Sequence, residues 1–260
     1  MREPVNYRMP AASPENPIHS PPVKNEGGIL NINKPAGLTS FAVVQQIRRI
    51  LNERKVGHCG TLDPMATGVL VVLFGNAVSR QDEYMTREKV YRAGMRLGIK
   101  TDTGDITGNV VQSSLPPVLS DAAVRTALEK FTGEIEQLPP MYSAVKFKGR
   151  RLYQYAREGK EIARPPRKVN ILSIDLLSIK HPVIDFRVVC SKGTYIRTLV
   201  EDIGSCLNVP ATLESLERER SGGFSIDDSL GWETLVRMSR EDLISRSVVY
   251  GDLLGREKSQ

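Results

Sequence analysis

Cysteine is scarce in this chain and is not arranged for metal binding or for a disulfide framework. The 260 residues contain three cysteines, and Cys59, Cys190 and Cys206 show no paired CxxC spacing. A structural zinc site and a disulfide-stapled fold are therefore not expected. A reducing, cytoplasmic environment fits this cysteine usage best.

Long apolar runs are missing as well. No stretch approaches the roughly 20 apolar residues that a membrane-spanning helix needs, so no membrane span is expected. The first 27 residues lack the apolar core of a secretory signal, and Glu3, Glu15 and Glu26 argue against an acid-poor transit peptide. This proline-rich segment, residues 1–27, is predicted to be a disordered tail.

The overall composition is that of a globular protein. Hydrophobic residues make up 40% of the chain and charged residues 25%, which is typical of a fold with a buried core. The formal net charge is +6. This excess suits an anionic partner such as nucleic acid, although many basic proteins bind none.

Hydrophobic periodicity predicts strands and helices in alternation. The continuous apolar run 68–75 predicts a buried strand, and residues 91–99 alternate as a half-buried strand does. Ser40 is expected to cap a helix over residues 41–52. The predicted class is α/β or mixed α+β around one large sheet. Further strands are expected near 29–32, 169–180 and 183–190, and further helices over 120–133 and 195–207.

Residues 137–168 differ from the rest of the chain, because prolines bracket a segment in which cations and aromatic residues are interleaved. Such a projecting segment can hold a phosphate backbone and stack on bases. A solvated helical hairpin with tyrosines in its core would show the same pattern, and the pattern alone does not favour either interpretation. The cations that would contact an RNA backbone are Lys146, Lys148, Arg150 and Arg151.

Two long motifs and three further segments resemble, in the same order, segments of the TruB family of tRNA pseudouridine synthases. The long motifs are GHCGTLDPMATGVL (57–70) and SKGTYIRTLVEDIG (191–204). The match extends from about residue 28 to residue 225 and is completed by NKPAGLTS (33–40), KVYRAGMRLGIKTDTGD (89–105) and MYSAVKFKGRRLYQYAREG (141–159).

This resemblance implies a catalytic domain over residues 28–230 with the pseudouridine synthase fold, a bent mixed sheet flanked by helices, and an inserted RNA-gripping segment at 137–168. It implies a monomer that converts uridine 55 in the T-loop of tRNA to pseudouridine, with no metal and no organic cofactor.

Family members commonly carry a C-terminal PUA domain. Only 30 residues follow Leu230, fewer than the roughly 50 of an independent domain, so residues 231–260 are expected to be a short tail without a full PUA domain.

Pseudouridine formation breaks the C1′–N1 glycosidic bond, turns the uracil and rejoins it through C5. A carboxylate can act there as a nucleophile or stabilise charge, and Asp63 is the candidate, presented by turn residues and stiffened by Pro64. Whether it attacks the sugar, attacks the base or abstracts a proton stays open. The resemblance places Arg197 beside it as a fixed cation that favours the ionised carboxylate. Lys34 and Lys192 match family lysines that contact phosphate or support the loop.

The target uridine belongs to a folded loop and must be extruded to react. The resemblance implies that Tyr91 packs on the flipped uracil, and that Tyr195 and Leu216 line its pocket. It also implies that His58 wedges into the T-loop and fills the space left by the flipped nucleotide. From the pattern alone, Tyr91 and Leu216 would be core residues.

Two other functions fit parts of the sequence. An RNA-binding or RNA-folding module could keep this scaffold without turnover, but the intact set of Asp63, Tyr91 and Arg197 argues against it. A glycoside or nucleoside hydrolase also breaks a C1′ bond. Such enzymes usually need a second carboxylate as acid or base, and the motif around Asp63 holds no other acid.

Overall fold

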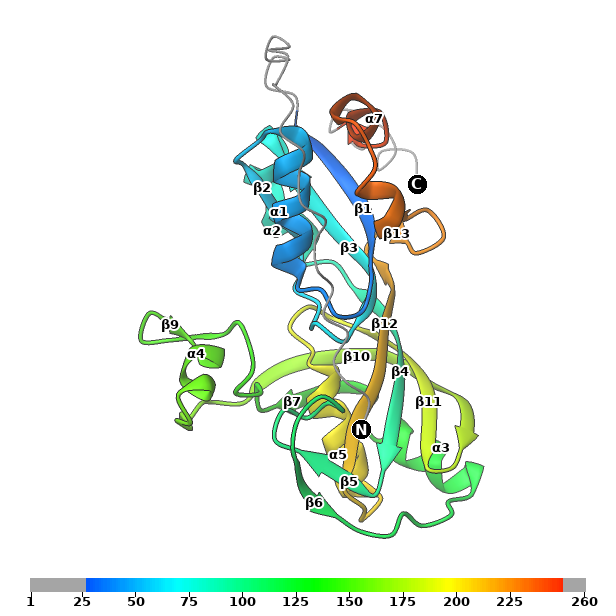
Figure 1. The fold of residues 1–260 in the computed structure, drawn as a ribbon. Helices are drawn as coiled ribbons and strands as arrows, with labels where there is room; N and C mark the ends of the chain where they lie inside the picture. The colour runs from blue at the N-terminus through cyan, green and yellow to red at the C-terminus, as the bar shows by residue number, and fades with distance from the viewer. Residues whose placement is uncertain (1–26, 250–260) are drawn as a thin grey trace.

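A computed structural model describes residues 27–249, and its central feature is a sheet of 11 strands (Figure 1). The main path through this sheet is β14-β1-β3-β12-β4-β11-β10-β7, with parallel and antiparallel pairs mixed. The structure confirms the predicted mixed α/β fold around one large sheet. The predicted tail at residues 1–27 lies outside the described residues except for Gly27.

The elements have the following bounds. The strands are β1 (Gly28–Lys34), β2 (Val56–His58), β3 (Thr67–Phe74), β4 (Lys89–Leu97), β5 (Ile99–Thr101), β6 (Val110–Ser113), β7 (Gly133–Gln137), β8 (Lys146–Phe147), β9 (Arg150–Arg151), β10 (Arg167–Lys180), β11 (Val183–Cys190), β12 (Ala211–Ser221), β13 (Phe224–Ser225), β14 (Leu230–Gly231) and β15 (Val248–Val249). The helices are α1 (Ser40–Leu51), η1 (Gly75–Arg80, a 3₁₀ helix), α2 (Gln81–Met85), α3 (Asp121–Glu129), α4 (Leu152–Arg157), α5 (Ile196–Cys206), α6 (Trp232–Leu235) and α7 (Arg240–Ser245).

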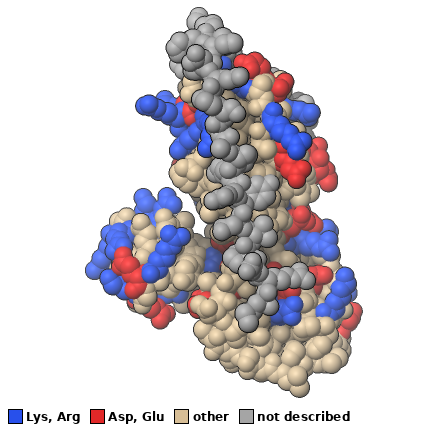
Figure 2. Space-filling view, viewed as in Figure 1, with Lys and Arg blue, Asp and Glu red and all other residues tan. Residues whose placement is uncertain are grey.

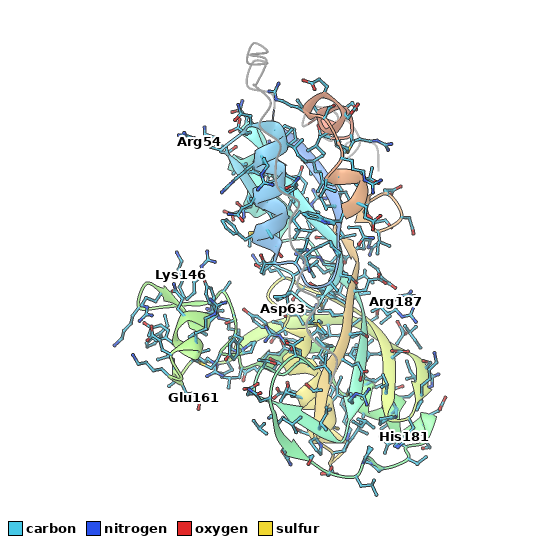
Figure 3. The ribbon with its side chains drawn as sticks, in the orientation of Figure 1. Arg54, Asp63, Lys146, Glu161, His181 and Arg187 are labelled. Atoms are coloured by element: carbon cyan, nitrogen blue, oxygen red, sulfur yellow. The ribbon has the colours of Figure 1, made fainter. Side chains whose placement is uncertain are left out.

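Strand β12 joins two halves of the sheet. It pairs with β4 over nearly its whole length, from Ala211 to Ser221, but with β3 only through Glu217 and Arg218. Figure 1 shows β1 and β3 in the upper half, whereas β4, β10 and β11 lie in the lower half. The sheet therefore bends where β3 meets β12, and the loop that carries Asp63 lies at this junction (Figure 3).

Helices cover each half because their apolar faces match the buried sides of the strands. Val43 and Ile47 of α1 and Leu199 and Ile203 of α5 are fully buried in one continuous hydrophobic core. Strand β3 is buried on both faces, since Val69 and its alternate neighbours contribute to a second, smaller core. This double burial explains its uninterrupted apolar run. No helix within residues 27–249 has the length and apolar character needed to cross a membrane.

Local details differ from the sequence predictions. The N-cap of α1 is Thr39, whose Oγ1 accepts a hydrogen bond from the backbone N–H of Ala42 at 3.0 Å, so the prediction of Ser40 as the cap is wrong. The strand predicted over 91–99 ends at Leu97, because Gly98 adopts a φ of 90°. Part of the predicted C-terminal tail is ordered: residues 231–249 include α6, α7 and β15, which pairs with β1.

Candidate active site

The loop that carries Asp63 is fixed by contacts with the segment that enters α1. The hydroxyl of Ser40 accepts a hydrogen bond from the N–H of Leu62 at 2.8 Å and donates one to the carbonyl of Leu62 at 2.9 Å. The N–H of Gly37 donates to the carbonyl of Pro64 at 2.8 Å. Asp63 is therefore held on both sides, and its side chain remains 32% exposed.

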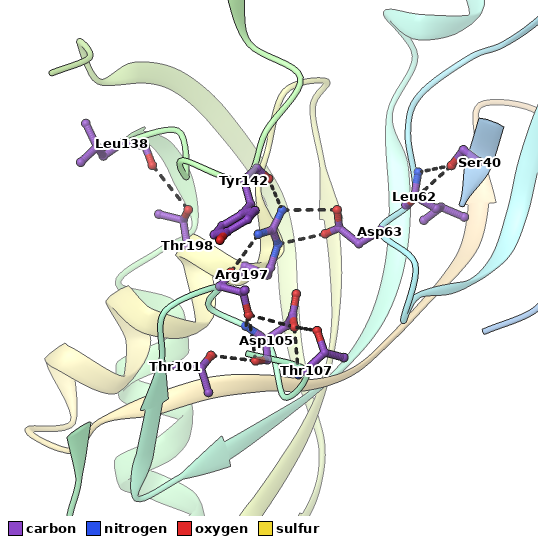
Figure 4. Close-up of polar contacts among 11 residues, drawn as sticks. Ser40, Leu62, Asp63, Thr101, Asp105, Thr107, Leu138, Tyr142, Arg197 and Thr198 are labelled. Atoms are coloured by element: carbon purple, nitrogen blue, oxygen red, sulfur yellow. Dashed lines mark hydrogen bonds and ion pairs between the residues drawn. The ribbon is translucent and has the colours of Figure 1, made fainter. Parts of the chain in front are cut away.

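Arg197, in the first turn of α5, binds Asp63 through two nitrogens (Figure 4). Its Nε lies 2.9 Å from Oδ2 of Asp63, and its Nη2 lies 3.3 Å from Oδ1. Nη1 also donates to the carbonyl of Thr103 at 2.8 Å, and Nη2 to that of Tyr142 at 2.7 Å. The Arg197 side chain is only 5% exposed. Four acceptors thus fix a buried guanidinium, while the carboxylate it holds can still be reached from outside.

The loop between β5 and β6 supplies one of these acceptors. The carboxylate Oδ1 of Asp105 accepts hydrogen bonds from the N–H of Thr107 at 3.0 Å and from the hydroxyl of Thr103 at 3.1 Å (Figure 4). Asp105 is itself buried. It therefore shapes the turn that presents the Thr103 carbonyl to Arg197.

Gln137, at the end of β7, holds the start of α5. Its side-chain Oε1 accepts a hydrogen bond from the N–H of Tyr195 at 3.0 Å, and its Nε2 donates to the carbonyl of Tyr195 at 3.3 Å. Gln137 is 1% exposed. The side-chain amide of Gln137 thus bonds both the N–H and the carbonyl of Tyr195, as the backbone of a neighbouring strand would. Tyr195 lies two residues before Arg197, so Gln137 helps to fix where α5 begins.

Tyr91, Tyr195 and Leu216 are the residues that the resemblance assigns to a substrate pocket, and the structure places Tyr91 and Leu216 in the main hydrophobic core. The side chains of Tyr91 and Leu216 come from adjacent strands of the sheet, and both are almost completely buried. Burial raises the pKa of both tyrosine hydroxyls, and both hydroxyls lie within electrostatic range of Asp63. Both phenols are therefore neutral near pH 7.

Lys34 lies beneath the same loop and has no exposed surface. Its ammonium donates hydrogen bonds to the carbonyls of Pro35 at 2.9 Å, Leu38 at 2.7 Å and Pro64 at 3.2 Å. Burial lowers its pKa from 10.5 to about 8. Lys34 thus binds the backbone of the Asp63 loop and does not face solvent as a phosphate contact would.

His58 and Lys192 lie at the edge of the site. Burial lowers the pKa of His58 to about 4, so its imidazole is neutral at pH 7, which suits a steric role. Its backbone carbonyl accepts a hydrogen bond from the side chain of Gln81 at 2.8 Å. Lys192 is exposed on the turn between β11 and α5, five residues before Arg197 in the chain.

Residues 137–168 form a projection with one short hairpin, β8–β9, and one helix, α4, so the helical-hairpin alternative does not describe this segment. Lys and Arg side chains gather on this projection (Figure 2), and Figure 3 shows Lys146 at some distance from Asp63. The guanidinium of Arg150 stacks 4.6 Å from the ring centre of Tyr155 and also forms an ion pair with Glu158. All four predicted RNA-contacting cations are exposed: Lys146, Lys148, Arg150 and Arg151.

Sequence reasoning missed four polar residues that support this site. Ser40 is predicted only as a helix cap, and Asp105 belongs to the motif at 89–105 without a predicted role of its own. No role was predicted for Gln137 or for Arg218, which is 1% exposed on β12. Polar residues buried among apolar neighbours are a signal for such roles, but burial cannot be seen in a sequence without the fold.

Comparison with known proteins finds matches over most of this chain. A family model described as "TruB family pseudouridylate synthase (N terminal domain)" matches residues 48–196. The "tRNA pseudouridine synthase B" of Clostridium kluyveri is 50% identical over 208 residues, which cover 80% of this chain and 72% of that protein. The protein of the same name from Clostridium tetani is 45% identical over 217 residues, covering 84% and 75%.

Among solved structures, a chain from a Cbf5–Nop10–Gar1 complex superposes with a TM-score of 0.64 at 33% sequence identity. The match covers 80% of this chain and 53% of the other, so this chain spans about half the length of that neighbour. The resemblance therefore extends over most of the described fold.

Proposed function

The chain belongs to the TruB family of pseudouridine synthases, and from this premise we propose that it isomerises uridine 55 in the T-loop of tRNA to pseudouridine, with Asp63 at the reacting nucleoside. The observation that carries the proposal is the partly exposed Asp63 carboxylate held by two nitrogens of the buried Arg197. A carboxylate in this position is oriented before any substrate arrives, and preorganisation of this kind lowers the cost of reaching the transition state.

The reaction needs no net change in atoms or electrons. The C1′–N1 bond breaks, the uracil turns, C5 bonds to C1′, and the proton lost from C5 is balanced by one gained at N1. Asp63 meets the electron-poor sugar or the base during this exchange, either as a nucleophile or by taking a proton. Both routes require the same oriented carboxylate.

The other residues of the site have roles that follow from their surroundings. Tyr91 offers a ring face on which the flipped uracil stacks, and Tyr195 and Leu216 close the pocket around it. His58 is neutral and fills the space that the nucleotide leaves in the T-loop. Lys34 supports the Asp63 loop from below.

The RNA is held outside this pocket as well. The exposed cations of the β8–β9 hairpin, Lys146, Lys148, Arg150 and Arg151, contact the phosphate backbone of the T-arm. Lys192, on the exposed turn before α5, contacts phosphate nearer the pocket.

The enzyme acts as a cytoplasmic monomer whose catalytic domain spans residues 28–230. Its cysteines are unpaired, which fits a reducing compartment.

The test is incubation with a T-arm RNA tritiated at C5 of the target uridine. Wild-type protein releases tritium to water while the base stays in the RNA. A hydrolase would release free uracil, and a passive binding protein would release neither.

Asp63→Asn lowers the turnover rate by at least about 100-fold and leaves the dissociation constant for RNA within a few-fold of wild type. The control is Asp82→Asn, which changes an exposed carboxylate on α2 and keeps full activity. Near-wild-type turnover by Asp63→Asn would overturn the assignment.

A further inference from the structure

Arg218 is among the most deeply buried large side chains of the protein, with 1% of its surface exposed. Its Nε donates to the carbonyl of Val69 at 2.6 Å, and its Nη2 donates to the carbonyl of Gly60 at 3.1 Å. Within residues 27–249, none of the ion pairs involves this guanidinium. A buried cation without a carboxylate partner weakens folding, so its presence beside the proposed active site points to a role in function.

The backbone places Arg218 at the junction of the two halves of the sheet. It is the residue of β12 that pairs with Gly68 of β3 on one side and with Tyr91 of β4 on the other. The approach to β3 is so close that a Cβ at Gly68, where φ is 96°, would lie 2.3 Å from the Arg218 carbonyl oxygen. Arg218 therefore has little freedom to move relative to either strand.

Arg218 and Tyr91 are direct cross-strand partners, so their side chains project from the same face of the sheet at neighbouring positions. Burial raises the pKa of the Tyr91 hydroxyl, and the positive charge of Arg218 acts on the same hydroxyl and lowers it. A guanidinium can only donate hydrogen bonds, so toward Arg218 the Tyr91 oxygen can only accept. The single phenolic proton of Tyr91 is then free for a different acceptor.

We propose that Arg218 is a positioning residue for the reaction, which fixes the hydroxyl of Tyr91 so that its proton points toward the nucleoside bound beside Asp63. Val69 and Gly60 hold the guanidinium, and the guanidinium in turn holds the phenol. Tyr91 then serves the substrate in two ways, because its ring stacks on the base and its hydroxyl donates to an oxygen of the nucleoside. This inference rests on the proposed function.

A double-mutant cycle tests the proposal. Single-turnover rate constants are measured with excess enzyme and the tritiated T-arm RNA for wild type, Arg218→Lys, Tyr91→Phe and the double variant. Loss of the proposed charge-assisted hydrogen bond from Arg218 to the Tyr91 hydroxyl predicts a rate about 10- to 100-fold lower for Arg218→Lys. If Arg218 acts through the Tyr91 hydroxyl, the double variant loses no more than about threefold beyond Tyr91→Phe alone.

Controls separate this effect from a general loss of structure. Arg220→Lys changes an exposed arginine of the same strand, which pairs with Glu88, and keeps the wild-type rate. Thermal melts report folding of each variant, and Arg218→Gln, which keeps an amide donor, replaces Arg218→Lys in the cycle if the lysine variant does not fold. If Arg218→Lys instead causes a structural defect unrelated to Tyr91, the fold-decrease in rate of the double variant would equal the product of the two single fold-decreases.

The outcomes for the two proposals differ. If wild-type protein releases no tritium, the proposed function fails. The second outcome concerns Arg218 alone. If wild type and Arg220→Lys are active, but the rate of the double variant falls by nearly the product of the two single fold-decreases, the two residues act independently. The role of Arg218 is then overturned while the proposed function stands.

Discussion

Replacement of Arg197 by lysine separates the charge of this residue from its geometry. The guanidinium now makes four contacts of 3.3 Å or less, two with the Asp63 carboxylate and one each with the carbonyls of Thr103 and Tyr142. A lysine keeps the positive charge but has a single nitrogen on a flexible stem. It cannot reach both carboxylate oxygens and two carbonyls that lie in different directions.

The size of the effect follows from these contacts. If the ammonium keeps one bond to Asp63, the variant loses the second carboxylate bond and weakens or loses those to Thr103 and Tyr142. At a net value of about 0.7–1.3 kcal/mol for each of these three bonds, the total loss is about 2–4 kcal/mol. Expressed fully in the transition state, this corresponds to a rate lowered by about 30- to 1,000-fold.

The assay is single-turnover tritium release from T-arm RNA with Arg197→Lys in excess, alongside filter binding and thermal denaturation. We expect the rate constant to fall by the stated factor while the dissociation constant for RNA changes by less than about threefold, because Arg197 is buried and does not face the RNA backbone. Arg125→Lys, an exposed position on α3, is the matched control. A rate for Arg197→Lys within threefold of wild type would show that two-point orientation of Asp63 does not matter.

Two further predictions concern charge. Alanine at Lys148, Arg150 and Arg151 should flatten the salt dependence of T-arm binding by up to about one unit of log–log slope for each lost phosphate contact, whereas Lys180→Ala should leave the slope unchanged. Burial lowers the pKa of Lys34 from 10.5 to about 8. Between these two pH values the unfolded chain binds more protons than the folded protein, so folding becomes more favourable as the pH rises. The free energy of unfolding of wild type, relative to that of Lys34→Met, should therefore rise with pH by at most about 1.4 kcal/mol per pH unit. Denaturant titrations at pH 7, 8, 9 and 10 measure this difference, and a constant value across that range would contradict the shift.

The elements that the sequence predicts well are those whose burial is regular. The apolar face of α1 and the continuous run of β3 appear in the structure close to the predicted bounds. The order of strands in the sheet is not predicted by these patterns. Strand β12 lies between β3 and β4, although it follows them in the sequence by more than 100 residues. Pairing over such separations depends on the packing of the whole core, and periodicity carries no information about it.

The site shows the same division. Asp63 and Arg197 were brought together by the resemblance of two motifs, since neither spacing nor charge pattern relates residues 134 positions apart. Arg218 was missed because it belongs to the run Glu217–Arg218–Glu219–Arg220, which is typical of an exposed strand face. In the structure Arg218 is buried, whereas Arg220 is exposed and paired with Glu88. Register shifts between Leu213 and Ser215 and between Arg218 and Arg220 break the simple alternation along β12.

The position of the site follows from the bend in the sheet. Asp63 is carried by the loop between β2 and β3 in one half, and Arg197 by α5 in the other. Only Glu217 and Arg218 of β12 pair with β3 across the junction, so few backbone hydrogen bonds fix the two halves relative to each other. The Asp63–Arg197 pair, and the hydrogen bonds from Arg218 to the carbonyls of Val69 and Gly60, add side-chain links across it. The two sides of the ion pair come from different halves, which one continuous hydrophobic core already joins, so the polar links set the local geometry of the pair on a scaffold that the core holds. Substitution of a linking residue should therefore impair the reaction before it unfolds the protein.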